Sequence, residues 1–152
     1  MDTFSEIIHN KMLITPLVGW FVAQTLKTII HSVVNRQFTA ERMVGGGGMP
    51  SAHSATVCSL ATITALTYGV SGYEFAIAGI FAIVTMYDAM NVRWETGKQG
   101  RVLNDLIAAF NKLTKEKIGP DKALKELIGH SPLQVLMGAL LGIAVAFMMY
   151  FI

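Results

Sequence analysis

The sequence predicts an all-α, polytopic membrane protein with four transmembrane helices and a cytoplasmic amphipathic helix. Of its 152 residues, 53% are hydrophobic and only 14% are charged, whereas a soluble domain has about 25% charged residues. The chain ends in an uncharged apolar run from Leu133 to Ile152, which is about the length needed to cross a bilayer core. This length of chain fits a single membrane domain, residues 1–152.

Four apolar segments are the predicted spans. They cover about residues 13–34, 51–69, 75–92 and 132–152. The second span is rich in Ser and Thr, whose hydroxyls bond back to their own helix or across to a neighbour. The last span has Gly138 and Gly142 at a spacing that suits close helix packing.

The connections between the spans differ in length. Residues 70–74 form a tight turn, and residues 35–50 form a loop that ends in four glycines. Residues 93–131 are a long insert whose apolar residues recur at helical spacing among lysines: Val102, Leu106, Ala109, Phe110 and Leu113. We expect an amphipathic helix at the membrane surface, a break at Gly119-Pro120, and a short helix to about Ile128.

Basic residues gather on two connections that an even number of spans places on one side. They are Arg36, Arg42, Arg93, Lys98, Arg101, Lys112, Lys115, Lys117, Lys122 and Lys125, and the opposite side has only Lys11. Because cytoplasmic loops carry an excess of Lys and Arg, we predict a multi-pass protein of the cell membrane with both termini outside. Residues 1–15 are too polar for a cleavable signal peptide. Cys58, the single cysteine, excludes an intramolecular disulfide and a thiolate metal cluster.

Lys27 lies well inside the first span, where a lysine costs about 2.5–3.5 kcal/mol. It belongs to a polar stripe on one helix face, formed by Gln24, Lys27, Thr28, His31 and Asn35. Such a stripe faces a bundle interior or a wet cavity. Two structural alternatives are that Lys27 snorkels to the interface, or that it pairs with Asp88 of the third span and only holds the bundle together.

Two histidines stand at predicted helix starts on the basic side. His53 follows the glycine run and Pro50, in the first turn of the second span, where free backbone N–H groups favour an anion. His130 precedes the last span and can touch Gln134, one turn further on. Each histidine alone is more typical of a cap or interface residue, but the pair indicates a site.

This order of residues resembles the phosphatidic acid phosphatase type 2 superfamily, and most closely its small divergent branch in bacteria and plants. The resemblance rests on Pro50-Ser51-Ala52-His53, on Arg93, and on His130-Ser131-Pro132 followed by Gly138 and Gly142. It implies that Lys27, Ser51 and Arg93 bind phosphate, with Arg36 or Arg42 replacing the expected motif arginine. It also implies that His130 is the nucleophile and His53 the general acid.

The sequence departs from the superfamily pattern beside the nucleophile. Gln134 stands where the family has an Asp, which orients the His and stabilises its cation. Gln134 can orient the ring but supplies no charge, so Asp88 is the candidate for that charge. The long insert between Arg93 and His130 is a second departure.

The resemblance implies a lipid phosphate phosphatase that forms a phosphohistidine at the cytoplasmic leaflet without a cofactor or metal. Phosphatidic acid, phosphatidylglycerol phosphate and polyprenyl (di)phosphates are candidate substrates, and no nucleic-acid partner is expected. One alternative is a catalytically silent lipid-phosphate-binding protein. Another is an anionic-lipid transporter, for which four short spans would have to assemble as a homo-oligomer.

Overall fold

The computed structural model describes residues 3–36, 47–114, 118–120, 123–124 and 129–152. In that part of the chain the regular structure is entirely helical. The helices are α1 (Thr3–His9), α2 (Lys11–Asn35), α3 (Ala52–Tyr68), α4 (Tyr73–Met90), α5 (Val92–Thr114) and α6 (Pro132–Phe151). Each predicted span thus coincides with one helix, namely α2, α3, α4 or α6.

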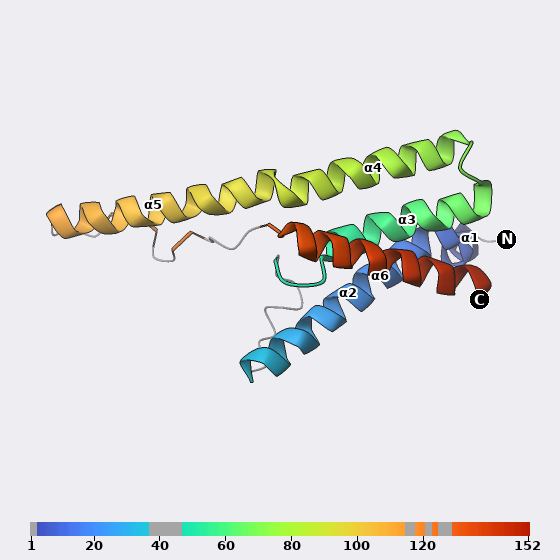
Figure 1. The fold of residues 1–152 in the computed structure, drawn as a ribbon, viewed down its shortest axis with the longest axis horizontal. Coiled ribbons are helices and arrows are strands. Elements are labelled where there is room, and N and C mark those ends of the chain that lie inside the picture. The colour runs from blue at the N-terminus through green and yellow to red at the C-terminus, as the bar shows by residue number, and fades with distance from the viewer. Residues whose placement is uncertain (1–2, 37–46, 115–117, 121–122, 125–128) are drawn as a thin grey trace.

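Helix α3 is the centre of the bundle (Figure 1). It packs against α6, α2 and α4, and α2 also packs against α6, whereas α2 and α4 do not contact each other. The buried side chains of α3 are small, including Ser54, Ala55 and Ser59, so neighbouring helices approach its backbone closely. As predicted, hydroxyls of α3 bond back to their own helix: Thr56 donates to Ala52 and Ser59 donates to Thr56.

Three helical segments are long and apolar enough to cross a membrane: α2, the combined α4–α5 segment and α6. Their outward faces carry exposed large hydrophobic side chains, such as Phe21, Ile80 and Leu140, which only a lipid environment solvates well. The protein is therefore a helical membrane protein. Helix α3 has 17 residues, about 25 Å at ~1.5 Å per residue, and lies buried among the other three.

Glycines set the close approach of α2 and α6 to α3. A Cβ at Gly142 would overlap the carbonyl of Ala55 and lie 3.0 Å from its Cα, and one at Gly138 would overlap the Ser51 carbonyl. On the other side of α3, a Cβ at Gly19 would lie 2.8 Å from Ser59 Oγ. The close packing expected from the Gly138–Gly142 spacing is confirmed, and its partner is α3.

Helix α5 continues α4 in nearly the same direction and extends beyond the bundle (Figure 1). The sequence predicted an amphipathic surface helix here. The segment is helical, as α5, and its Val102, Leu106 and Phe110 are exposed. The following chain returns along α5, because Asn111 bonds both backbone groups of Ile118 and Asn104 bonds both of Leu124. Apart from Ala123 and Leu124, which are not helical, the expected short helix to Ile128 lies outside the described residues.

The N-terminal part of α2 and the C-terminus meet at one end of the bundle. Lys11 Nζ donates to the carbonyls of Met149 and Tyr150, at 3.3 Å each. The starts of α3 and α6 and the junction of α4 with α5 lie at the other end (Figure 1). That second end holds the residues that the sequence singled out.

Candidate functional site

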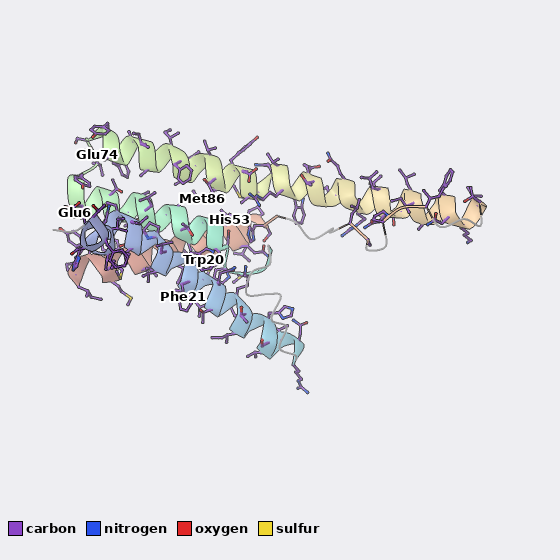
Figure 2. All side chains as sticks on the ribbon, turned by 180° about the vertical axis from the view of Figure 1, so that it is seen from behind. Glu6, Trp20, Phe21, His53, Glu74 and Met86 are labelled. Carbon is purple, nitrogen blue, oxygen red and sulfur yellow. The ribbon has the colours of Figure 1, made fainter. Side chains whose placement is uncertain are left out.

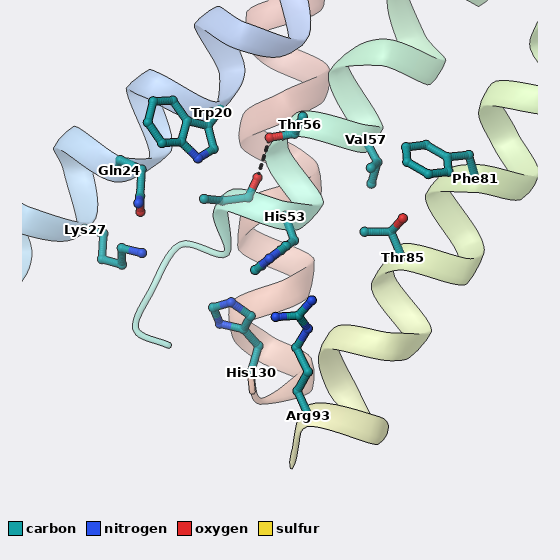
Figure 3. Close-up of a pocket in the computed structure, with 11 residues that line it drawn as sticks. Trp20, Gln24, Lys27, His53, Thr56, Val57, Phe81, Thr85, Arg93 and His130 are labelled. Carbon is teal, nitrogen blue, oxygen red and sulfur yellow. Dashed lines mark hydrogen bonds between the residues drawn. The ribbon is translucent and has the colours of Figure 1, made fainter. Parts of the chain in front are cut away.

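A cavity of about 490 Å³ opens at the end of the bundle where α3 and α6 begin (Figure 3). Its polar lining comes from the helices α2 to α5 and from the residues before α6. Gln24 and Lys27 come from α2, His53 and Thr56 from α3, Thr85 and Arg93 from α4 and α5, and His130 from the residues before α6. Trp20, Val57 and Phe81 form an apolar part of the wall.

Lys27 is 4% exposed and points into this cavity (Figure 3). Gln24 and Thr28 of the same stripe are also buried, His31 is half-buried and Asn35 is exposed. The expectation that the stripe faces the bundle interior therefore holds for its first three members. Because the Lys27 side chain is directed into the cavity, the alternative in which it snorkels to the interface is excluded.

The stem of Lys27 passes directly beneath Gly48. A Cβ on Gly48 would lie 3.0 Å from Lys27 Cδ, and the φ of Gly48 is +84°. Glycine is thus needed at this position for two reasons, its backbone conformation and the space for Lys27. The backbone at Gly48 therefore approaches the Lys27 side chain closely.

His53 and His130 face each other across the cavity. Their ring centroids are 5.7 Å apart, with an angle of 65° between the ring planes. His130 is buried and His53 is half-buried, and Nδ1 of His53 is enclosed without a hydrogen-bond partner among the described residues. The two histidines that the sequence paired are therefore neighbours.

A capping box fixes His130 at the start of α6. The Ser131 side chain accepts from the Gln134 backbone N–H, and Gln134 Oε1 accepts from the Ser131 backbone N–H at 3.2 Å. The same Oε1 lies 3.2 Å from His130 Nδ1. Because a carbonyl oxygen cannot donate, Nδ1 of His130 is the donor in this bond.

Asp88 is paired with Arg93. The Arg93 Nε donates to Asp88 Oδ2 at 2.7 Å, and both side chains are partly exposed. Asp88 therefore orients Arg93, which lines the cavity, and its role as the charge beside His130 stays a prediction. The ion-pair partner that the structure gives to Asp88 is Arg93.

Gly129 places His130 beside Arg93. Its φ is +110°, and a Cβ there would lie 2.6 Å from the Trp94 backbone nitrogen. The next backbone N–H, that of His130, donates to the Ala89 carbonyl at 3.0 Å. The start of α6 is thus fastened to the end of α4, which explains how residues on either side of a long insert reach one cavity.

The environment of His130 favours its neutral form. Burial lowers the pKa of the imidazole below its ordinary value of 6.5, and the positive charges of Lys27 and Arg93 lower it further. Hydrogen bonds with the Gln134 side chain and the Gly48 backbone act in the opposite direction without reversing the shift. A neutral imidazole is the form that can act as a nucleophile.

The remaining expected residues are not at the cavity wall. Ser51 is fully buried and its hydroxyl caps α3, accepting from Ser54 N–H; it, and not Pro50, directly precedes the helix. Arg36 is exposed at the end of α2, and Arg42 lies outside the described residues. Trp20, Thr85 and Phe81 line the cavity without having been predicted, since a lone aromatic or threonine in an apolar run is not distinctive in a sequence.

Comparison with known proteins bears on this arrangement. Residues 8–145 match the divergent PAP2 family. The chain belongs to this family. The matched segment of this divergent PAP2 protein includes every residue that lines the cavity of about 490 Å³.

A relative within the curated proteins is the uncharacterized membrane protein YuiD of Bacillus subtilis (strain 168). It is 39% identical over 146 residues, which cover 91% of this chain and 92% of the relative. No solved structure matches the chain. The family links this divergent PAP2 protein to a phosphatase superfamily, and the relative is named as a membrane protein.

Proposed function

We propose that this protein is a lipid phosphate phosphatase that works through a phosphohistidine intermediate. The observation that carries the proposal is the pairing of His53 with His130 in one cavity that Lys27 and Arg93 also line. Two cations stabilise the charge that builds on phosphoryl oxygens. Two imidazoles supply a nucleophile and a general acid.

In the first step, Nε2 of His130 attacks phosphorus and forms an N–P bond. The bond between phosphorus and the lipid oxygen breaks, and His53 gives its proton to the leaving alkoxide. In the second step, His53 takes a proton from water, and the resulting hydroxide attacks phosphorus. The N–P bond then breaks, inorganic phosphate leaves, and His130 regains its lone pair.

The proposed orientation places the cavity at the cytoplasmic face. We propose that α3 spans the membrane together with the three longer helices, so that both termini are outside. Among described residues, the cavity end carries Arg36, Arg93, Lys98, Arg101 and Lys112, and the opposite end carries Lys11 with Glu6 and Glu74. This distribution supports the orientation. The apolar face of α5 and its basic neighbours support contact with membrane lipids.

Phosphate release from purified protein in detergent tests the proposal. The panel contains phosphatidic acid, phosphatidylglycerol phosphate and polyprenyl phosphates, with His9→Ala as the control because His9 is exposed and far from the cavity. We expect release by the wild type and by His9→Ala, and none above background by His130→Ala. Normal release by His130→Ala would overturn the assignment of the nucleophile.

A catalytically silent lipid-phosphate binder is the second candidate. The observation that favours it is that His130 contacts the uncharged Gln134 while Asp88 is engaged by Arg93. Gln134 then offers no negative charge to the cation that forms at His130 during phosphoryl transfer. Binding of a lipid phosphate with no release from any member of the panel would select this candidate over the phosphatase.

A further inference from the structure

A second cavity of about 410 Å³ continues from the first along the bundle. Phe81 of α4 lines both cavities, and in Figure 3 its ring points from α4 toward Val57 of α3. The wall of the second cavity is mainly apolar, with Met12 from α2, Leu60 from α3, and Ile77 and Ala78 from α4. The proposed mechanism uses none of these residues.

Together the two cavities follow one groove. Helix α3 is its floor, and α2 and α4 are its walls, which do not contact each other. The groove therefore lies between two helices whose backbones do not approach each other closely. His53 and Glu74 lie toward its opposite ends (Figure 2), and Tyr68 and Tyr73 line the end near Glu74.

The groove is longer than one leaflet. Its floor, α3, is about 25 Å long at ~1.5 Å per residue, while half of a bilayer core is about 15 Å. Phe81 lies near the middle of α4 (Tyr73–Met90). The first cavity thus covers the half that contains Lys27 and the histidines, and the second cavity covers the half beyond Phe81.

We infer that the second cavity binds the distal part of a single long hydrocarbon chain whose phosphate lies between Lys27, Arg93 and the two histidines. This rests on the proposed function and names its substrate class: a single-chain lipid phosphate with a chain longer than one leaflet, such as a polyprenyl phosphate. A chain that fills only the cytoplasmic half leaves the second cavity empty. A longer chain passes Phe81 and buries additional apolar surface there, at about 25 cal/mol per Å².

A chain-length series with matched variants tests this inference. The substrates are octyl phosphate, hexadecyl phosphate and a long polyprenyl phosphate, and the measurement is kcat/KM for phosphate release. Ile77→Trp fills the second cavity, and Ile80→Trp is the control. Both isoleucines are on α4 and similarly exposed, at 65% and 63%, so neither change disturbs the core, but only Ile77 lines the cavity.

We expect the wild type to favour the polyprenyl over the hexadecyl substrate by about tenfold, which corresponds to ~1.4 kcal/mol. Ile77→Trp should bring that ratio close to one, and Ile80→Trp should leave it unchanged. Cleavage of all three substrates with no long-chain preference, or the same ratio in both variants, overturns the inference and leaves the proposed function standing. If no substrate is cleaved, octyl phosphate included, the proposed function fails and this substrate assignment fails with it.

Discussion

Gln134 is the residue that most distinguishes this site from the superfamily pattern. It holds the His130 ring through Nδ1 and at the same time closes the capping box of α6. An uncharged acceptor fixes the tautomer of the ring but does not stabilise an imidazolium. In the mechanism that we propose, orientation by Gln134 and the neutral state of His130 favour nucleophilic attack, and Gln134 adds no negative charge.

Replacing Gln134 by the isosteric Glu supplies the missing charge. Gln134→Glu should raise kcat about tenfold, equivalent to ~1.4 kcal/mol of the activation barrier, because a carboxylate stabilises the cation formed at His130. Gln134→Leu, which cannot accept a hydrogen bond, should lower kcat. Steady-state kinetics on a lipid phosphate measures both. A lower kcat in Gln134→Glu than in wild type would show that charge at this position is unfavourable.

The pH dependence of kcat/KM reports on His130. Its pKa is below the ordinary 6.5 because of burial and nearby cations, and protonation of the nucleophile abolishes attack. Activity should therefore persist as pH falls through 6.5 and be lost only at lower pH. In Gln134→Glu the carboxylate favours the imidazolium, so the loss should begin at higher pH. An acidic limb centred above 6.5 in the wild type would contradict this description of His130.

Among the helices, α3 and α6 depend most on glycine. Gly142→Ala would force its Cβ against the Ala55 carbonyl, and we expect a loss of about 1–3 kcal/mol of stability, the range for overpacking. Gly79→Ala on α4 is the matched control, since a Cβ there has no neighbour within 4 Å. Thermal unfolding in detergent compares the two. Equal stability of both variants would contradict the packing of α6 on α3.

Gly129 links the start of α6 to the junction of α4 and α5. Gly129→Ala combines a strained φ with a clash against Trp94, whereas Gly69→Ala has a similar positive φ but open space. We expect Gly129→Ala to lose most phosphate release, because His130 is displaced from Arg93, and Gly69→Ala to keep it. Similar activity in both variants would show that the contact with Trp94 does not position His130.

The whole molecule has a polar end and an opposite end that holds both termini. Lys112→Cys and Ser71→Cys, both at exposed positions, test the orientation, since the native Cys58 is buried. A membrane-impermeant thiol reagent added to intact cells should label Ser71→Cys and leave Lys112→Cys unlabelled until the cells are opened. The reverse labelling would place the cavity on the outer face.

Much of this fold follows from the sequence, because the length of each apolar segment and the spacing of glycines can be read from a short stretch of chain. The four predicted spans coincide with helices, and the Gly138–Gly142 spacing predicted close packing. The direction of α5 and the return of the chain along it could not be predicted, because they depend on contacts such as Asn104 with Leu124. The pairing of Asp88 with Arg93 was not predicted, since sequence spacing alone does not decide which cation its carboxylate meets.

The central claim is that phosphate becomes covalently attached to His130. Protein incubated with a lipid that carries a radiolabelled phosphate, then quenched with alkaline denaturant, should hold label on the peptide that contains His130. His130→Ala should hold none, and His9→Ala should match the wild type. Continuing phosphate release with no label on that peptide would contradict the phosphohistidine mechanism.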